Sequence, residues 1–305
     1  MQITLGPVLY HWKPEIWRDF YFRIADEAPI DIVSVGETVC SKRTPFYEEY
    51  LSKVIERLDK AGKQVLLSSY LLISLERERK HVENLVTHAQ HLVEMNDISG
   101  LLHMGQKPHT IGPFVNSYNE GTVAFFASNG ATRICLPPEL PLTSIEAIAQ
   151  SHPDIAIEVF SFGRIPLAIS ARCYHARLHK QSKDKCRFVC ELDPDGLEVD
   201  TLSGEKFLSV NGVQTLSYNC VNLLPELDQL RKTGIKGIRL SPQDCDMVAI
   251  AQIFRDTLNE KLESSVAVEK CRHIYKNAPF ANGFALGIPG AEWKTVFATS
   301  NGLGE

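Results

Sequence analysis

Three of the chain's eight cysteines lie in one basic stretch of the sequence. Cys173, Cys186 and Cys190 are separated by twelve and then three residues, and residues 172–187 hold six Lys or Arg, two His and a single acid, Asp184. Thiolates are soft ligands, so a group of them suits an iron–sulfur cluster or a structural zinc ion. The spacing alone does not choose between these metals. Ferredoxin-type runs are absent, and zinc sites more often use a two-residue spacer than three.

The same residues also allow a structural interpretation. A free cysteine behaves as a small buried apolar residue, and we expect this of Cys135 in the apolar run ATRICLPP and of Cys220, Cys245 and Cys271. The cations of residues 172–187 could offset the charge of a cluster and lower thiolate pKa values, or they could simply be solvated. A local nucleic-acid patch is less favoured, because aromatic residues are sparse in this stretch.

The composition sets limits on partners and location. A chain of 305 residues with 44% hydrophobic and 23% charged residues is typical of a soluble globular protein. A net charge of -5 gives no overall basic footprint, so we expect no nucleic-acid partner. We also expect no signal peptide and no transmembrane segment. The predicted location is therefore cytoplasmic, where thiols stay reduced and suit a metal site better than disulfides.

Short apolar runs alternate with amphipathic ones along the chain. This pattern predicts eight βα-like steps and favours a parallel sheet closed into a TIM-like (β/α) barrel. The open doubly wound sheet is the competitor, but no GxGxxG follows the first strand. We expect a barrel over residues 1–262, a cysteine-bearing insertion at about 164–206, and a short C-terminal tail over 263–305. The predicted strands span 3–10, 31–37, 64–70, 98–104, 110–116, 131–138, 155–163 and 235–243.

Reactive groups of such a barrel belong at the carboxyl ends of its strands. The polar candidates there are Glu37 and Cys40 after the second strand, His103 after the fourth, Asn116 after the fifth, Glu158 in the strand before the insertion, and Arg239 in the last. A barrel would bring Cys40 to the same mouth as the other three thiols. Glu37 and Glu158 could be functional, as acid–base groups or polar anchors for a ligand, or structural, as helix caps or partners of a basic neighbour. His103 is more often a hydrogen-bonded core or rim residue than a ligand or base. No GxSxG, HExxH or P-loop pattern supports a hydrolase.

Three blocks of sequence resemble the collagenase-like peptidase family, peptidase family U32. IEVFSFGRIPLAISARC (157–173) is similar to the family signature, GPFVNSYN (112–119) to a barrel segment, and FANGFALGIPG (280–290) to a C-terminal element. The signature positions that match are Glu158, Phe160, Gly163, Ser170, Arg172 and Cys173. Most members have a cysteine soon after the glycine, but GRIPLAIS has none, and Cys40 is present instead.

The set of Cys40, Cys173, Cys186 and Cys190 resembles that of family members in oxygen-independent ubiquinone biosynthesis. The resemblance implies a [4Fe-4S] cluster held by these four residues and a heterodimer with a related UbiU-like protein. It also implies support from a UbiT-like lipid-binding accessory protein. The implied reaction is anaerobic hydroxylation of the isoprenoid-bearing aromatic ring of ubiquinone precursors, with prephenate as oxygen donor. The peptidase name of the family places no protease residues on this chain.

Two other functions stay open at the level of sequence. The chain could be a non-catalytic partner whose cluster is structural or oxygen-sensing. It could also be a peptidase or an RNA- or protein-modifying enzyme of the wider family, since a shared fold does not transfer activity. Within a hydroxylase, this subunit would either hold the ring or only relay electrons.

Overall fold

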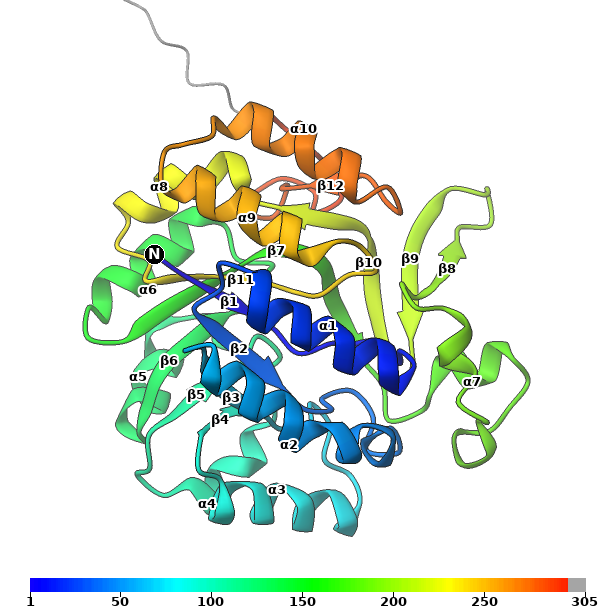
Figure 1. Cartoon of the computed structure of the whole chain (residues 1–305). Coiled ribbons are helices and arrows are strands. Elements are labelled where there is room, and N and C mark those ends of the chain that lie inside the picture. Colours follow the sequence, from blue (N-terminus) through cyan, green and yellow to red (C-terminus); the bar gives the residue numbers. More distant parts are fainter. Residues whose placement is uncertain (296–305) are drawn as a thin grey trace, which may run out of the picture.

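Eight parallel strands close into a barrel in the computed structural model, which describes residues 1–295 (Figure 1). Strand β11 closes the circle because it pairs in parallel with β1 on one side and with β7 on the other. The predicted (β/α) barrel and its number of strands are therefore confirmed. Around the barrel the strands are β1 (Gln2–Leu5), β2 (Ile32–Val35), β3 (Gln64–Ser68), β4 (Leu92–Met95), β5 (His109–Ile111), β6 (Ala131–Leu136), β7 (Ala156–Ile169) and β11 (Gly237–Leu240).

Short runs of mostly aliphatic residues form these strands. All four residues of β2, IVSV, are buried, and so are all four of β11, GIRL. Strands of a parallel barrel are covered on both faces, which explains why their sequences do not alternate between apolar and polar. The polar exception in β11 is Arg239. Its side chain lies inside the barrel, because it contacts Glu94 of β4 on the opposite wall.

Helices cover the outside of the barrel (Figure 1). In α2 the buried residues Tyr47, Val54 and Leu58 recur at helical spacing and lie on the face toward the sheet. Gly62 follows the end of this helix with a φ of 74°, a left-handed conformation that glycine adopts without steric cost. The outer helices are α1 (Pro14–Glu27), α2 (Thr44–Lys60), α3 (Glu76–His88), α5 (Glu120–Ser128), α6 (Leu142–Ser151), α8 (Leu227–Lys232) and α9 (Met247–Leu258).

The fourth strand lies earlier in the chain than the sequence pattern indicated. The predicted strand 98–104 is a 3₁₀ turn, η1 (Ile98–Gly100), followed by the short helix α4 (Leu101–Met104). The Asp97 side chain accepts the amide of Ser99 and so starts the turn. The barrel strand is instead β4, whose four residues lie outside all of the predicted strands. His103 consequently lies in α4 and not at a strand end, so that placement was wrong.

The segment between β7 and β11 builds an extension at the carboxyl ends of the barrel strands. Strand β7 is fourteen residues long and continues past the barrel, where it pairs with β10 (Gln214–Asn222) in an antiparallel arrangement. Strands β9 (Lys206–Asn211) and β8 (Leu197–Asp200) extend this sheet. Between β7 and β8 the chain forms α7 (Tyr174–Leu178) and two 3₁₀ turns, η2 (Lys183–Lys185) and η3 (Val189–Leu192). Figure 1 shows α7, β8 and β9 projecting beyond the barrel.

The C-terminal part of the described chain packs onto the barrel. Helix α10 (Ser264–Ile274) contacts α9, and its buried residues include Val268 and Cys271. Strand β12 (Phe280–Ala281) pairs with β10. The rest of the predicted tail, residues 296–305, lies outside the described residues. Within residues 1–295, none of the helices combines the length and apolarity needed to cross a bilayer.

Candidate functional site

The four predicted site cysteines line one pocket at the mouth of the barrel. This pocket has about 350 Å³ of empty space, part of it open to solvent, and its walls include Cys40, Cys173, Cys186 and Cys190. Cys40 comes from the loop after β2, whereas the other three come from the extension after β7. All four are free thiols. The structure therefore brings together residues that lie far apart in the chain, as the barrel topology predicted.

The loop that carries Cys40 is shaped by Glu37. The Glu37 carboxylate accepts hydrogen bonds from the backbone amides of Val39 and Cys40, each at 2.8 Å. The Arg43 amide then donates to the Cys40 carbonyl and starts the approach to α2. Burial raises the pKa of Glu37, against the effect of Arg43 and of the two amides. These contacts show a structural role for Glu37, one of the two roles that the sequence left open.

The thiol of Cys173 lies at the start of α7. Its Sγ accepts a hydrogen bond from the Ala176 amide at 3.4 Å. The same sulfur donates through its S–H to the carbonyl oxygen of Gly212, in the hairpin between β9 and β10, with an S–O distance of 3.3 Å. Burial raises the pKa of both Cys40 and Cys173, and Arg43 acts in the opposite direction on each. Without a bound cation these two thiols therefore favour the protonated form, and a metal would have to displace their protons.

The chain between Cys186 and Cys190 adopts an unusual conformation. Arg187 and Phe188 both have positive φ values, 49° and 53°. Two consecutive non-glycine residues in the left-handed region cost free energy that the surrounding contacts must offset. Phe188 contributes part of the offsetting free energy, because its ring packs edge-on against the ring of Phe46 with centroids 4.7 Å apart. The strained turn places both thiols on the same pocket.

A buried guanidinium lies beside the thiols. Arg43 is 1% exposed, and its Nη atoms donate to the Leu9 carbonyl and the Asn211 side-chain oxygen. Its Nε finds no hydrogen-bond partner within residues 1–295. Burial opposes the charge of Arg43, but Cys190, Glu37 and Cys40 raise its pKa. A buried cation whose hydrogen-bond partners are neutral suits an anionic occupant of the neighbouring pocket.

Two lysines add to the positive charge at the rim. Lys42 Nζ donates to the Lys183 carbonyl at 2.8 Å and lies 3.7 Å from the sulfur of Cys186. Lys183 also lines the pocket. The other five cations of residues 172–187 are exposed. Of the cations in this basic stretch, Lys183 therefore lies at the pocket and the other five are solvated.

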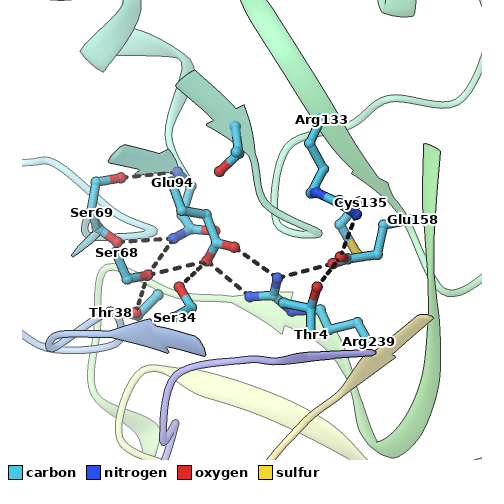
Figure 2. A network of polar contacts seen from close by, with 12 residues as sticks. Thr4, Ser34, Thr38, Ser68, Ser69, Glu94, Arg133, Cys135, Glu158 and Arg239 are labelled. Atoms are coloured by element: carbon cyan, nitrogen blue, oxygen red, sulfur yellow. Dashed lines mark hydrogen bonds and ion pairs between the residues drawn. The ribbon is translucent and has the colours of Figure 1, made fainter. Parts of the chain in front are cut away.

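A second group of polar residues fills the barrel interior (Figure 2). Arg239 makes a two-pronged ion pair with Glu94, with N–O distances of 2.7 and 2.8 Å, and a longer one of 3.3 Å with Glu158. Glu158 also contacts Arg133 at 3.3 Å and the Thr4 hydroxyl. These pairings show a structural role for Glu158. Sequence reasoning missed Glu94, because its strand β4 was not among the predicted strands.

The remaining predicted residues lie apart from the thiol pocket. Cys135, Cys220 and Cys271 are buried in the core as expected, and Cys245 is partly buried. Asn116 is exposed and lines a larger open cleft beyond the ends of β4 and β5. His103 is half-buried in α4 and lines neither pocket.

The open cleft and the thiol pocket are linked by a small apolar cluster. The cleft has about 1060 Å³ of empty space, part of it open to solvent, and Leu71 and Phe114 line it. These two residues belong to a small apolar cluster at the mouth of the barrel. The cluster consists of Leu9, Val39, Leu71 and Val213, with Cys40, Leu72, Phe114, Ile169 and Cys173 packed against it. Residues of the cleft and two of the pocket thiols, Cys40 and Cys173, therefore pack against the same apolar cluster.

Comparisons with known proteins give a family and two partial relatives. The model of peptidase family U32 matches residues 20–295. tRNA hydroxylation protein P of Escherichia coli is 28% identical over 157 residues, which are 47% of this chain and 34% of that protein. Its namesake from Haemophilus influenzae is 41% identical over 58 residues, 19% of this chain and 13% of that protein. The match thus spans about a third or less of each curated relative.

The similarity to solved structures is weaker. N-acetylneuraminate lyase from Fusobacterium nucleatum, complexed with pyruvate, gives a TM-score of 0.46 at 10% identity, over 88% of this chain and 77% of that one. No argument about function rests on a similarity of this size.

Proposed function

This chain belongs to peptidase family U32, and we propose that it is a UbiV-like iron–sulfur subunit of an oxygen-independent hydroxylase. Its substrate would be the aromatic ring of ubiquinone precursors. The observation that carries the proposal is the pocket lined by four free thiols beside the buried cation of Arg43. The similarity to tRNA hydroxylation protein P supports a role in hydroxylation within this family.

The residues of the pocket fit a [4Fe-4S] cluster. Cys40, Cys173, Cys186 and Cys190 would hold it, since four thiolates are its usual protein ligands. Such a cluster carries net negative charge, and Arg43, Lys42 and Lys183 supply positive charge around the same pocket. When bound, the cluster would supply one-electron transfer, while the protein sets its position and its surroundings.

The chain would also have to bind the aromatic ring of the substrate near the thiol pocket and exclude water from it. The open cleft combines aromatic residues, Phe114 and Phe125, with amide side chains such as Asn116 and Asn119. This combination suits a substrate with an aromatic head and an apolar tail. Leu71 and Phe114 line the cleft and belong to the apolar cluster that also contacts Cys40 and Cys173, so they would keep the ring close to the thiols and help to exclude water. We assign prephenate as oxygen donor, a UbiU-like protein as partner and a UbiT-like protein as lipid-binding accessory by resemblance alone.

Anaerobic purification tests the cluster. We expect brown protein with about four irons per chain, and loss of both colour and iron in Cys186→Ser. Cys245→Ser is the matched control, because this partly buried thiol lies outside the pocket. Colourless protein that contains zinc and no iron would refute the proposal.

Cellular assays test the substrate. We expect cells that carry Cys186→Ser to accumulate unhydroxylated ubiquinone precursors under anaerobic growth, whereas Cys245→Ser cells do not. A folded Cys186→Ser protein that lacks the cluster and still supports full hydroxylation would favour a structural or oxygen-sensing cluster instead.

A second candidate function is hydroxylation of tRNA, which the two partial relatives favour. The proposed cluster is the same for both candidate functions, so only the hydroxylated product can distinguish a quinone precursor from tRNA as substrate. Mass spectrometry of tRNA nucleosides from cells with and without this chain would show a lost hydroxylated nucleoside if RNA is the substrate. The net charge of -5 favours the quinone precursor.

A further inference from the structure

Two histidines and an aspartate meet beside the cysteine pocket, and one of them, His175, also lines that pocket. His175 in α7 and His179, one turn further on, stack their rings with centroids 5.4 Å apart. Asp193 follows η3. One potential ligand atom from each of the three residues lies within 4.8 Å of the other two. This cluster has no place in the function proposed above.

The buried member of the cluster is His175, whose side chain is fully buried. Its Nδ1 lies 3.2 Å from the carbonyl oxygen of Val210. A carbonyl oxygen can only accept, so Nδ1 carries the proton in this contact. This leaves Nε2 as the free ring position, and Nε2 points toward Asp193.

The contact between His175 and Asp193 is close but poorly aligned. Nε2 and the carboxylate oxygen Oδ2 are 2.9 Å apart, yet neither atom has an aligned hydrogen-bond partner among the residues that the structure describes. An unprotonated Nε2 would place a lone pair against a carboxylate oxygen, which is unfavourable. A cation shared by the two atoms, or a second proton on the ring, removes this conflict.

We propose that His175, His179 and Asp193 form a second metal site, which takes a divalent first-row transition ion such as Zn²⁺. Imidazole nitrogen with one carboxylate suits such ions, whereas Mg²⁺ and Ca²⁺ prefer sites made of oxygen atoms alone. The Val210 carbonyl on the far nitrogen of His175 is the usual partner of a metal-binding histidine, because it fixes the tautomer and the ring orientation. His179 and Asp193 are half-buried, so solvent can complete the coordination.

The position of this site suggests its role. His175 is two residues after Cys173, and Asp193 is three residues after Cys190. An ion bound here would tie the start of the cysteine segment to its end and restrain the chain that carries Cys186 between them. This role, unlike the metal site itself, rests on the proposed cluster. We expect bound Zn²⁺ to slow the loss of iron from the protein several-fold.

Zinc binding to the full chain, purified anaerobically with its cluster, tests the metal site. After removal of loosely bound metal with a chelator, we expect equilibrium dialysis with elemental analysis to find one Zn²⁺ per chain in addition to the iron. His179→Ala should weaken this binding at least tenfold and leave the iron content unchanged. The exposed His88→Ala is the matched control and should bind Zn²⁺ as the wild type does.

Two outcomes would overturn the metal site. The first is that the protein binds no zinc in addition to its iron. The contact between His175 and Asp193 would then be an ion pair only. The second is equal zinc binding by His179→Ala and the wild type, which would place the ion elsewhere. A variant with all four pocket cysteines changed to serine separates this result from the cluster. If that variant folds, it should lose iron and keep its zinc.

Discussion

A buried carboxyl at the junction of α8 and the C-terminal segment should make stability depend on pH. Glu226 lies in the 3₁₀ turn η4 (Leu224–Glu226), where one carboxyl oxygen accepts the Asn282 side-chain amide at 2.8 Å. The other oxygen has no partner among residues 1–295. Burial raises the pKa of Glu226 from 4.5 to about 7, although the Asn282 hydrogen bond acts in the opposite direction. The protonated carboxyl is thus favoured in the folded chain.

The sign and size of the effect follow from this difference. Between about pH 4.5 and pH 7 the folded state holds a proton that the unfolded state has lost, so the free energy of unfolding falls as the pH rises. Above pH 7 the decrease in the free energy of unfolding is complete and amounts to roughly 3 kcal/mol. Glutamine cannot ionise and keeps the acceptor oxygen. Glu226→Gln should therefore match the wild type near pH 4.5 and exceed it by up to this amount at pH 8.

Thermal unfolding of both proteins at a series of pH values measures the effect. At about 2 °C per kcal/mol, the midpoint of the variant should lie about 6 °C above that of the wild type at pH 8, and the gap should close toward pH 5. Comparison at each pH cancels the titration of the other groups. Glu83→Gln, at an exposed position on α3, should show no such gap. Parallel curves for Glu226→Gln and the wild type would refute the reasoning.

Three further changes test the pocket and the barrel. Arg43→Met removes the buried cation and should lower the reduction potential of the proposed cluster by on the order of 100 mV, measured by redox titration. An unchanged potential would show that Arg43 does not influence the cluster. Gly212→Ala adds a Cβ only 2.7 Å from Arg43 Nη2 at a φ of 65°, so the melting temperature should fall by an amount equivalent to about 1–3 kcal/mol. Glu94→Gln leaves Arg239 without its two-pronged partner and should destabilise the chain by about 3–5 kcal/mol. Unchanged melting temperatures would contradict the last two expectations.

The sequence supported the barrel because each strand and helix has its own local pattern. It misplaced the fourth strand because LVEM is too short to show a period, and it continues the pattern of the helix before it. The more apolar ISGLLHM that follows was the more convincing strand, yet Ile98 and Leu102 are exposed. Because β4 was not predicted, its residue Glu94 was not recognised as part of the barrel interior.

The site was predictable in its thiols but not in the groups around them. Barrel topology places the loop after β2 and the extension after β7 at the same end, which predicts that Cys40 meets the other three. Arg43 is only three residues from Cys40, but nothing in the sequence indicates that this cation is buried whereas Arg172 and Arg187 are solvated. Likewise, the spacing of His175 and His179 is visible in the sequence, but their contact with Asp193 depends on how the extension folds back.

The pocket draws its walls from the loop after β2 and the extension after β7, and this has a consequence for how the protein matures. Strand β11, the last strand of the barrel in the sequence, pairs with both β1 and β7 and so closes the ring that holds the two regions at one end. A chain still emerging from the ribosome presents three thiols on a loose segment, and the fourth is not yet held near them. For the proposed cluster, insertion of iron and sulfide would therefore follow closure of the barrel, and a defect that delays closure would lower the iron content of the protein.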